Sequence, residues 1–239
     1  MNIFPSGDKG ILIKFGDHID ERLNLIIKNY VEKIKEENFP WIEEIVPSFT
    51  DVMVLYSCEH IRYFEAKRIL MSYFEVEERM SKIETRIVNI PVLYGEDYGI
   101  DIIDVASMNG LSVRDVINIH TESRYLVYML GFTPGFPYLG GLDERLHTPR
   151  LKTPRKVIQA GSVAIGGEQT GVYPIDSPGG WRIIGRTPLK LFDMDREPPA
   201  LLRQGDYIQF FEINAVEFEE IEKQLQEGCY ELEVEELRI

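Results

Sequence analysis

The sequence has few cysteines and no long apolar run. Its 239 residues include only Cys58 and Cys229, which lie far apart, so nothing indicates a disulfide framework. No apolar run approaches the ~20 residues that a membrane-spanning helix requires. The start of the chain lacks a basic segment followed by an apolar one, so no secretory signal is predicted. These absences predict a protein of the reducing cytoplasm with no membrane partner.

Basic residues are also in the minority, because 26 Lys and Arg stand against 40 Asp and Glu and give a net charge of −14. Such an acidic chain is unsuited to general binding of nucleic acid or anionic membranes. The charge is uneven, however, because between Arg145 and Lys190 eight basic residues are opposed only by Glu168 and Asp176. This basic stretch suits a bound small anion, or alternatively a solvated face that pairs with acidic neighbours.

Several motifs of catalysis and cofactor binding are absent. The chain has no G-x-x-x-x-G-K-[ST] phosphate loop, no G-x-G-x-x-G after a strand and no G-x-S-x-G nucleophile elbow. Its four histidines (His18, His60, His120 and His147) show no metal-ligand spacing, so we predict no metal site. A serine–histidine–aspartate triad built from distant residues stays open, because such triads are defined in space.

The first part of the chain alternates strand-like and helix-like periodicity. Leu23, Ile27, Tyr30 and Ile34 recur at helical spacing and give one apolar face. The predicted elements are strand 9–15, helix 17–37, strands 42–46 and 52–56, helix 59–80 and strand 86–92. This βαββαβ order is typical of a ferredoxin-like sheet. We therefore expect an α+β fold that begins with a ferredoxin-like α/β sandwich domain over residues 1–84; the alternative is that the last strand belongs to the next domain.

The second part of the chain, residues 85–239, is mostly strand-like with frequent glycine and proline turns. The predicted strands are 125–130, 156–160, 162–165, 171–175, 181–187 and 207–212. Many short strands of this kind predict a closed or nearly closed antiparallel barrel. Tyr230, Leu232 and Val234 alternate with glutamates and predict a half-buried edge strand.

Helix signals frame this barrel. Residues 101–108 predict a short helix that ends at Gly110, and Ser112 with Asp115 forms a capping box for a second helix running towards His120. Asn214 starts a final helix, which Gly228 can end.

Glycine and proline concentrate in one stretch, because residues 131–188 hold eleven of the nineteen glycines and seven of the thirteen prolines. Both residue types are costly in regular structure. Aromatic and aliphatic residues interrupt the stretch, which is unlike a disordered linker. Ordered loops at a functional site would justify this composition.

Four segments of this stretch resemble a known family. They read GFTPGFPYLGGLD (131–143), TPR (153–155), AGSVAIGGEQTGVYP (160–174) and SPGGWRIIGRTP (177–188). Together they resemble the allophanate hydrolase subunit 1 family, which includes the B subunit of bacterial 5-oxoprolinase and the histidine-kinase inhibitor KipI. The resemblance implies that the barrel domain, residues 85–239, is cyclophilin-like. A cyclophilin-like barrel raises the alternative of prolyl isomerase activity. The stretch does not show the catalytic pattern of the cyclophilins, and a shared fold does not imply a shared function, so this alternative is disfavoured.

The resemblance also implies a function shared with other chains. It implies the B subunit of an enzyme that cleaves 5-oxo-L-proline to L-glutamate with ATP hydrolysis, together with subunits A and C and most directly with C. ATP is then used by the complex, at a site on or shared with a partner. The alternative is a KipI-like inhibitor that binds a sporulation sensor histidine kinase. The resemblance extends to urea carboxylase, in which parts similar to subunits B and C lie side by side in the carboxyl-transfer region.

His120 and Arg155 are the candidate catalytic residues. His120 lies in the segment IHT, as in the family motif, and its imidazole suits acid–base work or a structural role at a helix end. Arg155 follows Thr153 and Pro154 and suits a bidentate contact with a carboxylate or phosphate, or a plain surface role. Arg150, in a second TPR segment, is a weaker candidate of the same kind.

The candidate substrate- or partner-binding residues fall into three groups. An aromatic–proline loop would form a rigid apolar wall, or a corner packed on the core; it contains Phe132, Pro134, Gly135, Phe136, Pro137 and Tyr138. Glycine turns would present backbone N–H groups, or simply join strands of a hairpin; they include Gly161, Ser162, Gln169 and Thr170. Trp181 would stack on a ligand, or belong to the core or a subunit interface.

Overall fold

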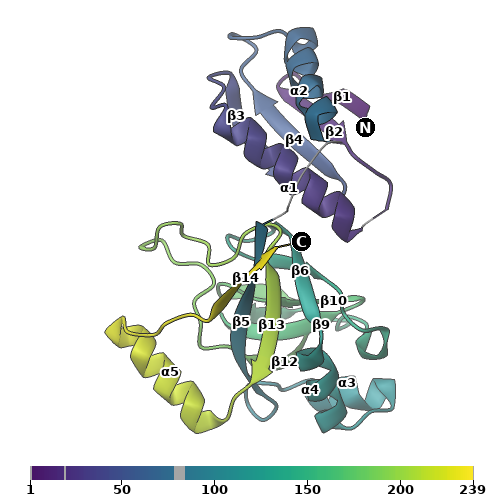
Figure 1. Ribbon diagram of the computed structural model, residues 1–239. Helices are drawn as coiled ribbons and strands as arrows, with labels where there is room; N and C mark the ends of the chain where they lie inside the picture. Colours follow the sequence, from purple (N-terminus) through teal and green to yellow (C-terminus); the bar gives the residue numbers. More distant parts are fainter. Residues whose placement is uncertain (1, 19, 78–83, 239) are drawn as a thin grey trace. The chain divides into compact units, whose positions relative to one another are not determined.

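The computed structural model describes residues 2–18, 20–77 and 84–238 (Figure 1). The chain forms two compact units, Met1–Glu84 and Thr85–Leu237. Both units combine helices with sheets, which confirms the predicted α+β class. Within the described residues, no helix is both long and apolar enough to span a membrane.

The first unit is a four-stranded antiparallel sheet with two helices on one face. Its elements are β1 (Asn2–Ser6), β2 (Gly10–Lys14), α1 (Glu21–Glu36), β3 (Ile42–Pro47), β4 (Asp51–Tyr56) and α2 (Tyr63–Glu77). Buried side chains of β2 and β4, such as Ile13 and Val54, pack against Ile27 of α1 and Leu70 of α2. The Tyr30 hydroxyl donates to the carbonyl oxygen of Leu70 at 2.8 Å and joins the two helices.

The strand order of this sheet, β1-β2-β4-β3, corrects the predicted βαββαβ arrangement. Strand 86–92, for which the sequence left both domains open, lies in the second unit. The N-terminal residues Asn2–Ser6 pair with β2 instead and supply the fourth strand. Pro5 is tolerated there because β1 is an edge strand. The predicted end of the second helix, near Met80, lies outside the described residues.

The second unit is a strongly curved sheet. Its strands are β5 (Glu84–Tyr94), β6 (Arg124–Leu130), β7 (Pro137–Gly140), β9 (Ser162–Gly166), β10 (Gln169–Val172), β12 (Arg182–Arg186), β13 (Tyr207–Glu212) and β14 (Val234–Arg238). The order is β10-β9-β12-β5-β13-β6-β7, and β14 also pairs with β5. The two end strands, β7 and β10, lie against each other, so the sheet is a nearly closed barrel. Figure 1 shows β5, β13 and β6 along its near side.

The barrel departs from the prediction in two respects. It is not wholly antiparallel, because β13 pairs with β5 in parallel. More than one hundred residues separate these strands, so no hairpin constrains their direction. The predicted strand 156–160 is present as β8 (Arg155–Ile158), but it lies outside the barrel, because it pairs with β11 (Ser177–Gly179) in a separate two-stranded sheet. The sequence does not predict β7 and β11 because proline and glycine dominate these segments.

The helices of the second unit follow their sequence signals. They are α3 (Ile102–Asn109), α4 (Val113–Glu122) and α5 (Ala215–Glu227). Gly110 and Gly228 adopt left-handed conformations after α3 and α5, and Ser112 and Asn214 form complete capping boxes. These local signals need no distant partner, which explains why the sequence predicts them correctly.

Candidate functional site

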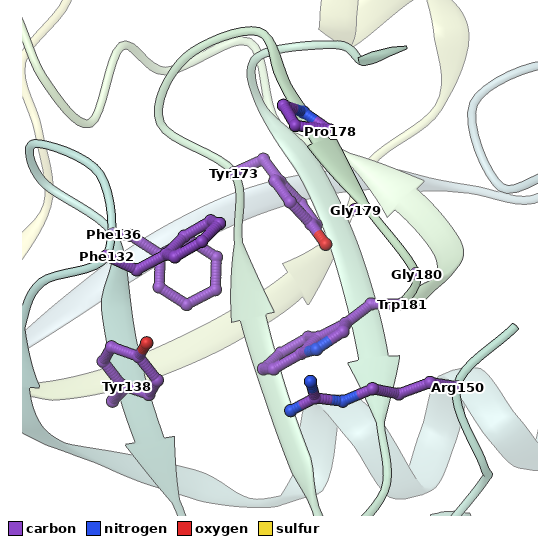
Figure 2. Close-up of a pocket in the computed structure, with 9 residues that line it drawn as sticks. All are labelled: Phe132, Phe136, Tyr138, Arg150, Tyr173, Pro178, Gly179, Gly180 and Trp181. Atoms are coloured by element: carbon purple, nitrogen blue, oxygen red, sulfur yellow. The ribbon is translucent and has the colours of Figure 1, made fainter. Parts of the chain in front are cut away.

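Aromatic side chains line a small cavity beside the barrel, with a volume of about 120 Å³. Figure 2 shows these aromatic rings around the opening, with the Arg150 guanidinium beside the Trp181 indole. The lining residues are Phe132, Phe136, Tyr138, Arg150, Tyr173, Pro178, Gly179, Gly180 and Trp181. Pockets for drug-sized ligands typically measure roughly 300–1,000 Å³, so this cavity suits a much smaller molecule.

Phe136 is the hub of the aromatic wall. Its ring centroid lies 5.3 Å from Tyr138, 5.5 Å from Tyr173 and 5.7 Å from Trp181, each in a perpendicular arrangement. Perpendicular aromatic pairs of this kind stabilise packing beyond their buried area. These contacts hold the wall together, because they join Tyr138 of β7 to residues that lie next to β7, β10 and β12.

The loop between β6 and β7 holds Phe132 at the cavity with a strained backbone. The Thr133 N–H donates to the Gly131 carbonyl oxygen at 2.7 Å, and Phe132 between them has φ +63°. This is the rare form of the γ-turn, which bulky residues seldom adopt. The Phe132 side chain is nevertheless 70% exposed. Strain that holds an exposed aromatic ring beside a cavity points to a ligand or partner contact.

The remainder of this loop explains its prolines and glycines. The Phe136 N–H donates to the Thr133 carbonyl oxygen at 3.1 Å, so Pro134 and Gly135 occupy the centre of a β-turn. Gly135 has φ +78°, which a glycine at that turn position accommodates. Pro137 then begins β7. These three predicted residues shape the wall, whereas Phe132, Phe136 and Tyr138 line the cavity.

The Trp181 indole packs against two glycines of neighbouring strands. Its side chain is 6% exposed and contacts Gly166 of β9 and Gly171 of β10. A Cβ atom added to Gly166 would lie 2.5 Å from the indole, so only glycine leaves room for the ring.

We expect Gly166→Ala to displace Trp181 and to lower the free energy of unfolding by about 1–3 kcal/mol, because the added methyl overpacks the site. Urea unfolding followed by tryptophan fluorescence would measure the loss. The matched control is Gly131→Ala, since a Cβ atom at Gly131 would have its nearest neighbour at 3.8 Å. Equal stability of the two variants would contradict the assigned packing.

Tyr173 and Arg150 are two of the residues that bring polar groups to the cavity. Burial raises the pKa of Tyr173, while a backbone hydrogen bond from Trp181 and the charge of Arg150 oppose that rise. The phenol therefore stays protonated near neutral pH and can donate a hydrogen bond. The Arg150 guanidinium carbon lies 5.6 Å from the centre of the Trp181 ring, within range of a cation–π interaction.

Arg155 lies outside this cavity. Its two terminal nitrogens donate to the two carboxylate oxygens of Asp101, at 2.8 Å and 2.7 Å. Asp101 is only 4% exposed and also accepts from the Ile183 N–H at 2.7 Å. A guanidinium engaged in this way has its bidentate fork occupied, so this geometry favours a structural role for Arg155. The weaker candidate, Arg150, lines the cavity, whereas the catalytic role of Arg155 stays a prediction.

His120 lies in the barrel core and is fully buried. Its Nδ1 lies 2.8 Å from the Tyr94 hydroxyl and its Nε2 lies 2.9 Å from the Thr170 hydroxyl. Thr170 donates its own proton to the Ala164 carbonyl oxygen, so it accepts from Nε2–H, and Nδ1 then accepts from Tyr94. Burial lowers the pKa of His120 to about 3. The imidazole is therefore neutral and internally satisfied, which favours the structural alternative over acid–base catalysis.

The predicted glycine turns also lie away from the cavity. Gly161 has φ +81°, and its N–H donates to the Tyr173 carbonyl oxygen at 2.7 Å. Ser162 begins β9 and pairs with Arg186 of β12, and Gln169 begins β10 opposite Gly166. These residues build strand connections, whereas Thr170 belongs to the His120 network.

The structure thus brings together five of the residues singled out in the sequence and adds Tyr173 and residues 178–180; the five are Phe132, Phe136, Tyr138, Arg150 and Trp181. Tyr173 lies in one of the four segments that carry the family resemblance, but nothing in its local sequence distinguishes it as a cavity residue. In the part of the chain that the structure describes, no group of three or more His, Cys, Asp or Glu side chains is arranged to hold a metal ion.

Comparisons with known proteins agree with the resemblance in the sequence. The family described as carboxyltransferase domain, subdomain C and D, matches residues 1–202. The 5-oxoprolinase B subunit of Bacillus subtilis (strain 168) is 45% identical over 223 residues, which cover 89% of this chain and 92% of that protein. Its namesake in Escherichia coli O157:H7 is 44% identical over 173 residues, covering 72% and 79% respectively.

A solved structure shares the fold. The crystal structure of K. lactis urea amidolyase superimposes with a TM-score of 0.78 and 21% identity, over 99% of this chain and 16% of that one. At this identity the likeness concerns the fold alone, and it places both units of the chain within a known architecture.

Proposed function

The chain belongs to the family of carboxyltransferase domains, subdomains C and D, and we propose that it is the B subunit of an ATP-dependent 5-oxoprolinase. In this proposal the complex opens the lactam of 5-oxo-L-proline with water to give L-glutamate, and ATP is hydrolysed in the same process. The observation that carries the proposal is the similarity to the 5-oxoprolinase B subunit of B. subtilis, which extends over 92% of that protein.

The small size of the aromatic cavity agrees with a subunit that supplies only part of an active site. A lactam amide is unreactive and needs activation, yet this chain has no phosphate loop and its aromatic cavity of about 120 Å³ is too small for a nucleotide. The proposal puts the ATP site outside the aromatic cavity, on a partner or at a surface shared with one. Subunits A and C are the proposed partners, with C the most direct, and the aromatic cavity is the proposed contribution of this chain.

The test is reconstitution from purified chains. A mixture of this chain with subunits A and C should form L-glutamate from 5-oxo-L-proline only when ATP is present. Omission of this chain should abolish glutamate formation. The proposal would be refuted if subunits A and C alone formed glutamate with ATP at a rate that adding this chain does not change.

The kinase-inhibitor alternative stays a prediction from the resemblance alone. The relatives described above carry the names of enzymes or enzyme subunits. The cytoplasmic location likewise stays a prediction.

A further inference from the structure

Arg150 differs from the other arginines of the basic stretch. Four of them have polar side-chain partners: Arg145 with Asp143, Arg155 with Asp101, Arg182 with Asp104 and Arg186 with Gln159. Within the described residues, Arg150 makes no hydrogen bond or ion pair, and its contact is the face of Trp181. The arginines of this stretch are thus internally paired except at the cavity.

The stacking on Trp181 orients Arg150 without consuming its hydrogen-bonding capacity. A guanidinium carries five N–H donors in a fixed plane, and a cation–π contact uses none of them. Holding the plane beforehand reduces the entropy lost when a ligand binds. A planar anion with two acceptor oxygens matches this geometry best, because it accepts two parallel hydrogen bonds.

The remainder of the cavity selects for a small ring. Its walls are the aromatic rings of Phe132, Phe136 and Trp181, and the Tyr173 hydroxyl lies among them (Figure 2). We propose that the cavity binds a small cyclic carboxylate, with the carboxylate on Arg150 and the ring against the aromatic wall.

This inference rests on the proposed function, since 5-oxo-L-proline is a five-membered lactam that bears one carboxylate. The protonated Tyr173 hydroxyl is then a donor for the lactam carbonyl oxygen. Arg150 is a binding residue in this scheme, and it leaves the activation of the lactam to other groups of the complex.

The first experiment measures the kinetics of the reconstituted complex. Arg150→Gln should raise KM for 5-oxo-L-proline by about tenfold or more while kcat changes little, because a charged hydrogen bond contributes to binding the substrate and the transition state alike. Arg150→Lys should recover only part of this loss, since a point charge cannot bond bidentately. Arg145→Gln, which breaks a surface pair with Asp143, is the matched control.

Two outcomes of that experiment overturn the inference while leaving the proposed function intact. One is a KM for 5-oxo-L-proline within about twofold of the unmodified complex. The other is a rise of KM for ATP in place of 5-oxo-L-proline, which would assign Arg150 to a phosphate.

A second experiment needs no activity and therefore separates the two proposals. In the full chain with Trp41→Phe, Trp181 is the remaining tryptophan. Its fluorescence should respond to 5-oxo-L-proline and to cyclopentanecarboxylate, but much less to 2-pyrrolidinone, which has the lactam and lacks the carboxylate. Adding Arg150→Gln should abolish the response to both carboxylates. An equal response to 2-pyrrolidinone, or no response to any ring in either the chain or the complex, would overturn the inference.

Discussion

Arg155→Gln is expected to lower the free energy of unfolding of the second unit by about 3 kcal/mol, because it leaves the buried carboxylate of Asp101 without its counter-ion. Among the residues that the structure describes, Asp101 would retain the backbone N–H of Ile183 as its remaining donor to the carboxylate. The Arg155 side chain is 27% exposed, so water can relieve part of the penalty and the value falls at the low end for buried pairs. Urea unfolding followed by Trp181 fluorescence, in the Trp41→Phe background, would report on this unit.

The control for this prediction is the same substitution at an exposed pair. Arg145→Gln removes a partner of Asp143 where the arginine side chain is 57% exposed, so at most about 1 kcal/mol should be lost. Adding Asp101→Asn to Arg155→Gln should recover part of the stability, since the buried charge is then gone. The structural role would be disproved if Arg155→Gln were as stable as Arg145→Gln and lacked activity in the complex.

The two TPR segments show what the sequence could and could not predict. Arg150 and Arg155 follow the same dipeptide, so nothing local distinguishes them. Their roles depend on Asp101, which lies 54 residues away from Arg155 along the chain and captures its guanidinium. A contact of such long range leaves no periodic or local signal. By contrast, the start of the helix capped by Ser112 and Asp115 depends on residues that are close in sequence, so the sequence predicts it correctly.

The aromatic wall and the barrel illustrate the same division. The density of aromatics and prolines in residues 131–138 indicated a rigid loop, and Phe136 indeed organises the wall. Tyr173 joins that wall only because β10 closes the barrel against β7. The parallel pairing of β5 with β13 likewise depends on the global topology. The local sequence therefore predicts the aromatic loop of the site. Which other residues line the cavity depends on how the sheet closes.

His120 should make the second unit sensitive to mild acid. Its pKa is about 3 when folded, because of burial, against an ordinary value of 6.5 when unfolded. Below pH 6.5 the unfolded chain therefore binds a proton that the folded chain does not, and stability falls as pH falls. The expected loss approaches about 1.4 kcal/mol per pH unit, and it amounts to roughly 1–2 kcal/mol between pH 6.5 and pH 5, because half of the unfolded imidazole is already protonated at pH 6.5; ordinary carboxylates are still mostly ionised in this range. Urea unfolding across this range would measure it.

His120→Gln tests whether this residue causes the acid sensitivity. The variant should be less stable at pH 8 by about 1–3 kcal/mol, since Tyr94 loses its partner in a buried site. Its stability should, however, vary much less between pH 6.5 and pH 5, because the titrating group is gone. A matched control is His60→Gln, which changes an exposed histidine bonded to Ser57. An unchanged slope in His120→Gln would show that His120 titrates normally and would reopen its candidacy for acid–base catalysis.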